Sequence, residues 1–118
     1  STTTTPDQHA ALGRAAAQRR DWSTAITAYG QAVKLAPRVP AYRQGLALAC
    51  YNGGKLEQAK SEFDTLAGAG DVGAHLYLGR IANQLGEPFG AGEHYNKYLA
   101  ANPGDAQAKK ELQELTGN

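Results

Sequence analysis

The stretch LGRAAAQRRDWSTAITAY, residues 12–29, decides the fold, because the chain contains it three times in related form. Residues 46–63 read LALACYNGGKLEQAKSEF and residues 78–95 read LGRIANQLGEPFGAGEHY, so the copies start 34 and then a further 32 residues along. Repetition at this period is typical of helical repeat proteins. The aligned rows of similar residues are Leu12/Leu46/Leu78, Gly13/Ala47/Gly79, Ala16/Cys50/Ala82, Ala25/Ala59/Ala91 and Tyr29/Phe63/Tyr95.

Each copy is expected to form two helices. Apolar residues from Trp22 to Val33 recur at spacings of three and four, which gives a helix one apolar face. Asp21 can cap that helix and Pro37 ends it. On the preceding helix, Leu12 is expected to lie in a buried stripe. The predicted helices span residues 6–19, 22–35, 40–52, 56–67, 72–85 and 89–101, with a capping helix from Asp105 to Leu115.

These elements predict an all-α solenoid of about seven helices in a single domain, residues 6–118, after a flexible lead-in, residues 1–5. The expected repeats are residues 6–39, 40–71 and 72–103, with the capping helix at 105–115. The small residues in the aligned rows let paired helices approach closely, and the rings fill the space beside them. Pro88, Gly90 and Gly92 lower helix propensity, so the third copy is expected to be the least stable.

Composition excludes several classes of function. Hydrophobic residues make up 42% and charged residues 19%, and the net charge is +1, which indicates neither nucleic-acid nor anionic-membrane binding. No apolar run approaches the roughly 20 residues of a membrane span. The lone Cys50 cannot form an internal disulfide. The start of the chain lacks the pattern of a signal peptide, and both the cytoplasm and a tethered position in a bacterial envelope stay open as locations.

The sequence contains no set of acid, base and nucleophile, so we expect no enzyme activity. Residues 68–73, GAGDVG, match the dinucleotide-binding spacing G-x-G-x-x-G, but they follow a predicted helix rather than a strand, and a hinge is expected instead. His9, His75 and His94 lack metal-ligand spacing and are interpreted as exposed helix positions. Cys50 is interpreted as a buried small residue. We therefore expect no cofactor and no metal.

The repeated rows resemble the tetratricopeptide repeat (TPR) family, whose pattern has Leu-Gly on the first helix, then Ala with a ring four residues later, then a closing Pro. The middle copy lacks the Pro, and His9, Arg43 and His75 stand where the family often has Trp. The matching residues are Leu12-Gly13, Ala25, Tyr29 and Pro37 in the first copy and Leu78-Gly79, Ala91, Tyr95 and Pro103 in the third.

The resemblance implies a protein-binding module that acts as an adaptor or scaffold in the assembly of a larger complex. In the family, the first helices of successive repeats line a concave groove. The mixture of amides, apolar groups and guanidinium groups predicted there suits a peptide with a carboxylate and apolar side chains. The expected groove residues are Arg14, Ala17, Gln18, Gln44, Leu48, Tyr51, Asn52, Leu76, Arg80, Asn83 and Gln84.

Two other interpretations stay open. One is that these faces are simply solvated; the other is that the chain is a structural module that self-associates into a homo-oligomer through an open edge of the repeat array. One branch of the family binds the C-terminal carboxylate of chaperones with Lys, Asn and Arg side chains. That role is disfavoured, because the corresponding positions hold Ala10, Arg14, Gly45, Gly73 and Tyr77.

Overall fold

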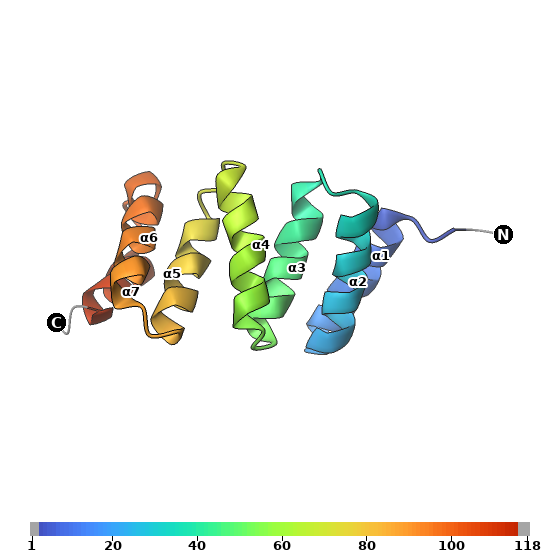
Figure 1. Ribbon diagram of the computed structural model, residues 1–118, viewed down its shortest axis with the longest axis horizontal. Helices are drawn as coiled ribbons and strands as arrows, with labels where there is room; N and C mark the ends of the chain where they lie inside the picture. The colour runs from blue at the N-terminus through green and yellow to red at the C-terminus, as the bar shows by residue number, and fades with distance from the viewer. Residues whose placement is uncertain (1–2, 116–118) are drawn as a thin grey trace. The chain divides into compact units, whose positions relative to one another are not determined.

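The computed structural model describes residues 3–115, which form only helices and their connections (Figure 1). Two compact units divide the chain within the fourth helix, the first ending at Glu62 and the second beginning at Phe63. The all-α prediction is confirmed. The helices are α1 (Pro6–Gln18), α2 (Trp22–Leu35), α3 (Pro40–Asn52), α4 (Leu56–Gly68), α5 (Ala74–Gln84), α6 (Pro88–Ala101) and α7 (Ala106–Leu115).

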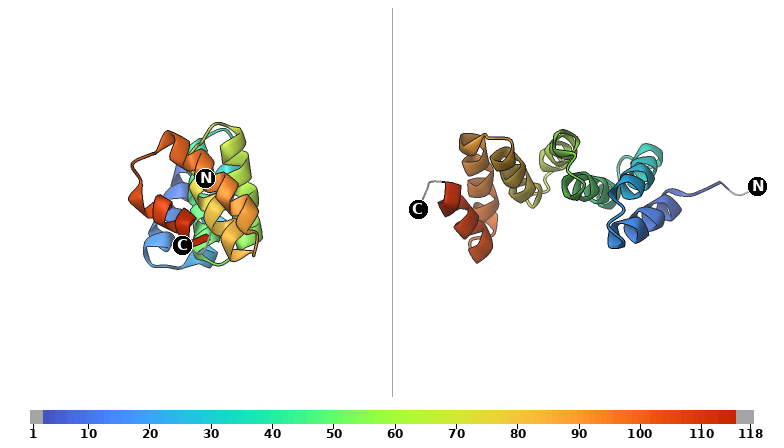
Figure 2. Two further views of the ribbon diagram at one scale, coloured as in Figure 1. Left: turned by 90° about the vertical axis from the view of Figure 1, so that its left-hand side faces the viewer. Right: turned by 90° about the horizontal axis from the view of Figure 1, so that it is seen from below.

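Consecutive helices pack as hairpins within each unit. In the first unit α1 packs against α2, and α3 packs against both. In the second unit α5 packs against α6, and α7 packs against α6. The pairs α1–α2 and α5–α6 can be followed from two further directions by their colours in Figure 2. Within each unit the packed helices are therefore neighbours in the sequence, apart from the contact between α1 and α3.

Side-chain caps fix where three of the helices begin. Thr5, placed by the sequence in the lead-in, is the N-cap of α1, and its hydroxyl accepts from the backbone N–H of Gln8 at 3.1 Å. The Gln8 side chain accepts in turn from the Thr5 backbone at 2.8 Å, which completes a capping box. Asp21 caps α2 as predicted, and Asp105 accepts from the backbone of Ala108 at 3.0 Å at the start of α7.

The turns inside the hairpins share one backbone conformation. Gly54 and Gly86 follow α3 and α5 with φ of 80° and 79°, in the left-handed region that glycine adopts without steric cost. The equivalent position in the first hairpin is Arg20, whose φ is 61°. The first hairpin therefore makes the same turn with a residue for which this conformation is unfavourable.

Two predictions about the packing and length of helices are wrong. Leu12 was expected in the buried stripe, but its side chain is 58% exposed, whereas Leu46 and Leu78 are 5% and 2% exposed. Within residues 3–115, no helix covers the face of α1 on which Leu12 lies. The first helix of the third copy was expected to start at Val72 but starts at Ala74, because residues 71–74 form a turn closed by a hydrogen bond from the Ala74 backbone to the Asp71 carbonyl at 3.2 Å.

The core of the first unit is built around the ring of Tyr29. A Cβ added at Gly13 would lie 2.7 Å from this ring, and a Cβ added at Gly45 would overlap it more severely. Glycines on α1 and α3 therefore let both helices approach the two sides of one aromatic side chain of α2. Gly13 was predicted to allow this close approach, whereas the tighter contact at Gly45 was not predicted.

Candidate functional site

The predicted groove residues of the first unit lie on two helices that contact each other, α1 and α3. Leu48 and Tyr51 on α3 are half-buried, one helical turn apart. Ala17 on α1 is also half-buried, and the other four predicted residues of this unit are exposed: Arg14, Gln18, Gln44 and Asn52. This face therefore combines a partly covered apolar centre with a polar surround, which is the usual composition of a recognition surface.

The predicted residues of the second unit lie on α5, and one of them already has a strong intramolecular partner. The guanidinium of Arg80 donates from Nε and from Nη2 to the two carboxylate oxygens of Glu111 on α7, at 2.9 and 3.0 Å. Leu76 is half-buried, and Asn83 and Gln84 are exposed. Arg80 thus ties α7 to α5, and its positive charge is compensated within the unit.

Glu111 is the centre of a polar network that attaches the capping helix. Besides Arg80, the Tyr95 hydroxyl donates to it at 2.7 Å and the Gln107 amide donates at 3.2 Å. These hydrogen bonds, first of all those from Arg80, lower the pKa of Glu111 from its ordinary 4.5 to about 2. Glu111 is therefore ionised throughout the neutral range, and α7 is held by a charge-assisted contact.

Tyr77 is a further component that the site prediction missed. Its ring stacks on Phe63 of α4 with centroids 4.9 Å apart and planes 3° from parallel. The Arg80 guanidinium lies 5.4 Å from the centroid of the Tyr77 ring. The spacing of three residues between Tyr77 and Arg80 on one helix could have indicated this contact. The pairing of Arg80 with Glu111, 31 residues away, has no comparable local signal.

One pair of equivalent positions, 19 residues apart, holds different residues in each hairpin. In the second hairpin Arg43 and Glu62 form an ion pair of 2.6 Å between α3 and α4. In the third, His75 and His94 occupy the same two positions, with their Nδ1 atoms 3.0 Å apart. In the first, His9 is paired with Ala28 by the same spacing of 19 residues. The interpretation of the histidines as exposed positions is wrong, because all three are half-buried, and His75 and His94 meet between α5 and α6.

The other residues considered for chemistry in the sequence are the glycine-rich stretch, Cys50 and the possible metal ligands. Residues 68–73 follow the helix α4, so no strand precedes the glycine-rich stretch. Cys50 is buried, and burial raises the pKa of its thiol to about 11, which keeps it protonated. Among residues 3–115 no group of three or more His, Cys, Asp or Glu side chains is placed to hold a metal ion. The helices of this same range include none that is long and apolar enough to cross a membrane.

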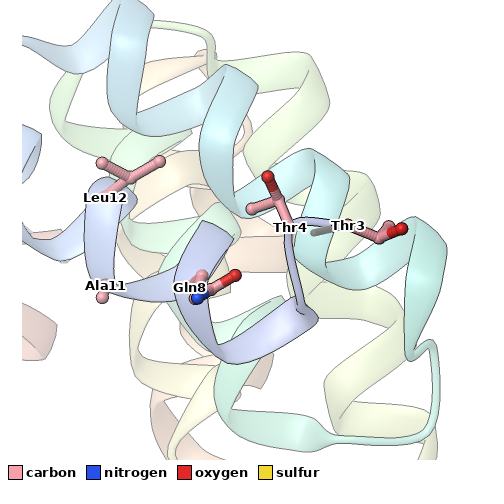
Figure 3. Close-up of a pocket in the computed structure, with 5 residues that line it drawn as sticks. All are labelled: Thr3, Thr4, Gln8, Ala11 and Leu12. Atoms are coloured by element: carbon pink, nitrogen blue, oxygen red, sulfur yellow. The ribbon is translucent and has the colours of Figure 1, made fainter. Parts of the chain in front are cut away.

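A hollow on the first hairpin is lined by none of the predicted groove residues. It has a volume of about 590 Å³ and is lined by Thr3, Thr4, Gln8, Ala11 and Leu12, at the outer side of α1 (Figure 3). A second hollow of about 410 Å³ continues along the outer side of α1 and α2 and shares Leu12. Both mark the uncovered edge of the first hairpin.

Hairpins of two antiparallel helices with small residues between them define a helical repeat protein. The sequence profile of the family described as "Tetratricopeptide repeat" matches residues 10–71 and 51–106. The chain belongs to this family, which confirms the resemblance seen in the sequence.

Solved structures of TPR domains share the fold. The TPR domain of Arabidopsis OM64 is 23% identical, with a TM-score of 0.86 over 95% of this chain and 94% of that one. The Sgt2 TPR domain from Aspergillus fumigatus is 28% identical, with a TM-score of 0.80 over 94% and 76%. The first TPR of Spaghetti (RPAP3), solved with an HSP90 peptide, is 18% identical, with a TM-score of 0.88 over 98% and 94%. Comparison with curated proteins gives no match.

Proposed function

We propose that this chain is a peptide-binding module that serves as an adaptor or scaffold in the assembly of a larger complex, and that it takes its ligand on the first helices of its hairpins. The observation that carries the proposal is the face of α1 and α3, where half-buried Leu48 and Tyr51 lie among exposed polar residues. TPR domains of similar fold have been solved with HSP90 peptides, which supports this class of ligand.

The charges of the two units suggest where a ligand carboxylate binds. Arg80 is already paired with Glu111, so a ligand would have to displace that carboxylate to reach it. Arg14 is exposed on α1, on the helix face that the family uses for binding. In the first unit we assign carboxylate recognition to Arg14 and recognition of apolar side chains to Leu48 and Tyr51. In the second unit, taken by itself, we assign recognition of an apolar side chain to Leu76.

The ligand we propose differs from the chaperone tail that the carboxylate-binding branch of the family recognises. Gly45 stands where that branch has Asn, and any side chain there would overlap the Tyr29 ring. Ala10 stands where the branch has Lys, and it is 2% exposed. A tail held mainly by its terminal carboxylate would therefore lack two of its partners on α1 and α3.

Selection from a random peptide library displayed on phage tests the proposal. Enriched peptides are synthesised with a fluorescent label, and their affinity is measured by anisotropy for the native chain, for Tyr51→Ala and for Arg14→Ala. The matched control is Gln31→Ala, which changes an exposed residue on the second helix of the first hairpin. We expect each groove substitution to weaken binding by roughly tenfold, corresponding to about 1.4 kcal/mol, and the control to have no effect. Equal affinity of all four proteins would refute the assignment.

The alternative function is self-association without a peptide ligand. The observation that favours it is Leu12, 58% exposed beside the two hollows at the edge of the first hairpin. A second copy bound at this edge would cover Leu12, so Leu12→Lys should abolish any dimer. Sedimentation velocity over a range of concentrations distinguishes the two functions. A dimer that dissociates in Leu12→Lys, from a chain that enriches no peptide, would establish the alternative.

A further inference from the structure

Two histidines of the second unit, which we call the histidine pair (His75 on α5 and His94 on α6), meet head to head. Their Nδ1 atoms are 3.0 Å apart, and their ring centroids are 5.3 Å apart. The difference between these distances is accounted for by the radii of the two rings, so both nitrogens lie close to the line that joins the ring centres. Each Nδ1 therefore points its N–H bond or its lone pair at the other.

This geometry limits how many protons the histidine pair can hold. A separation of 3.0 Å is that of an N–H···N hydrogen bond, which needs one proton between the two atoms. Two neutral rings satisfy it when one carries its proton on Nδ1 and the other on Nε2. A first added proton can bind at the outer Nε2 of the donor ring and leave the contact intact. A second must bind at the remaining inner Nδ1, where it faces another N–H.

The head-on approach fits a shared proton better than a shared metal ion. A metal bonded to both nitrogens at about 2.0–2.1 Å, on the line between them, would hold them about 4 Å apart. A metal placed off that line would require both rings to turn, because their lone pairs point along it. The observed 3.0 Å separation fits neither arrangement.

The surroundings favour fewer than two protons. Burial is the main cause that lowers the pKa of His75 and of His94, and Lys97 on α6 lowers both further. His75 itself also lowers the pKa of His94. Carboxylates act in the opposite direction, but they cannot relieve the collision of two N–H groups between the rings. The charged groups that act on the pair are Asp64 on α4, Asp71 before α5, and Glu93 and Lys97 on α6.

We propose that the histidine pair is a pH-sensitive contact between α5 and α6, which closes the third hairpin at neutral pH and opens it when both rings take up a proton. The second hairpin has the Arg43–Glu62 ion pair, rather than two histidines, at the same position. A pair of facing histidines is therefore found in the third hairpin and not at the same position of the second. The inference does not depend on whether the chain binds a peptide.

The sign of the effect follows from the direction of the shifts. Both histidine pKa values are lowered in the folded chain from the ordinary 6.5. The unfolded chain thus binds more protons below this pH, and the contribution of the histidine pair to stability is present above pH 6.5 and lost as the pH falls. Since His75 immediately precedes Leu76, loss of the contact also loosens the start of α5.

Stability measured against pH tests the proposal. The urea midpoint is determined between about pH 7.5 and pH 5 for the native chain and for His94→Asn, whose amide keeps a non-titrating polar group near the position of Nδ1. The matched control is His9→Asn on α1. EDTA is present throughout, so that no metal ion replaces the shared proton. We expect the urea midpoints of the native chain and of the control to fall on acidification. The fall for His94→Asn should be smaller than about half of the fall for the native chain. An equal loss in all three proteins would overturn the proposal.

An NMR titration of the native chain gives a second test that requires no variant to fold. Imidazole signals of the three histidines are followed through the same pH range. We expect His75 and His94 to titrate in two steps separated by more than about one pH unit, because strongly coupled groups do so. If His75 and His94 each took up a proton independently, near the ordinary histidine pKa, the shared-proton contact would not exist.

Discussion

The first and third hairpins carry the same sequence pattern, Leu-Gly followed by Ala and Tyr, yet hold their tyrosines by different means. Tyr29 lies between two glycines on two helices, Gly13 and Gly45, so close packing on both sides holds its ring. Among the described glycines, Gly79 alone has such a place beside Tyr95, where an added Cβ would lie 3.0 Å from the ring, and the Tyr95 hydroxyl donates to Glu111 of the capping helix. A repeat pattern thus specifies where a ring goes, while the neighbouring helices determine what keeps it there.

The largest difference between the hairpins should appear at the row of leucines. Leu78→Ala removes a side chain that is 2% exposed and should destabilise the chain by about 2–5 kcal/mol. Leu12→Ala removes one that is 58% exposed and should change stability by less than about 0.5 kcal/mol. Urea denaturation followed by circular dichroism measures both. Similar losses would mean that another part of the chain covers Leu12 in solution.

The next largest change in stability is expected from substitution of the glycines around Tyr29. Gly45→Ala places a methyl group into the ring and should cost about 1–3 kcal/mol, despite the higher helix propensity of Ala. The matched control is Gly30→Ala on α2, where an added Cβ has nothing within 4 Å and stability should rise by up to about 1 kcal/mol. Thermal unfolding of the two variants measures the contrast. A stabilising Gly45→Ala would show that Tyr29 can move aside at little cost.

The hydrogen bonds of Glu111, which attach α7 within the second unit, should contribute to stability in a pH-dependent way. Glu111→Gln removes the charge that Arg80 and Tyr95 bind, at a cost of about 2 kcal/mol at neutral pH. Because the folded pKa of Glu111 is lowered from 4.5 to about 2, this stabilisation exists above pH 4.5 and is lost as the pH falls toward 2.

Urea midpoints of the native chain and of Glu111→Gln should therefore converge between pH 4.5 and pH 2. Glu114→Gln, an exposed residue of the same helix, is the control and should follow the native chain. A constant difference between the native chain and Glu111→Gln down to pH 2 would contradict the network described around Glu111.

The smallest effect is expected at the hairpin turns. Arg20 adopts a left-handed φ of 61° where the third hairpin has Gly86 at 79°. Arg20→Gly should stabilise the first hairpin by roughly 1 kcal/mol or less, since glycine relieves the steric cost but loses more entropy on folding. The reciprocal Gly86→Ala should destabilise the third by a comparable amount. Thermal unfolding tests the pair, and changes of the same sign would contradict the comparison.

Much of the fold could be predicted because its determinants are local and repeated. Asp21, Pro40 and Pro88 mark helix starts by their own chemistry, and the rows of small and aromatic residues identify the family. Leu12 could not be placed in the same way, since its burial depends on a neighbouring hairpin rather than on its own helix. Periodicity shows which face of a helix is apolar and leaves open whether anything covers that face.

The candidate site was less predictable, because its polar residues form pairs over long sequence separations. Arg80 was assigned to ligand binding from its helix face alone, and its partner Glu111 lies on a helix predicted only as a cap. His75 and His94 looked isolated in the sequence, although the Arg43–Glu62 spacing of 19 residues recurs in them. Aligning the polar residues of the copies as well as the apolar ones would have indicated this contact.

The most direct test of the proposed function is NMR chemical-shift mapping of a selected peptide on the labelled chain. The account predicts that the largest perturbations fall on backbone amides of α1, α3 and α5, including those of Arg14, Leu48, Tyr51 and Leu76. Perturbations confined to α2, α4 and α6, or to the edge around Leu12, would contradict it.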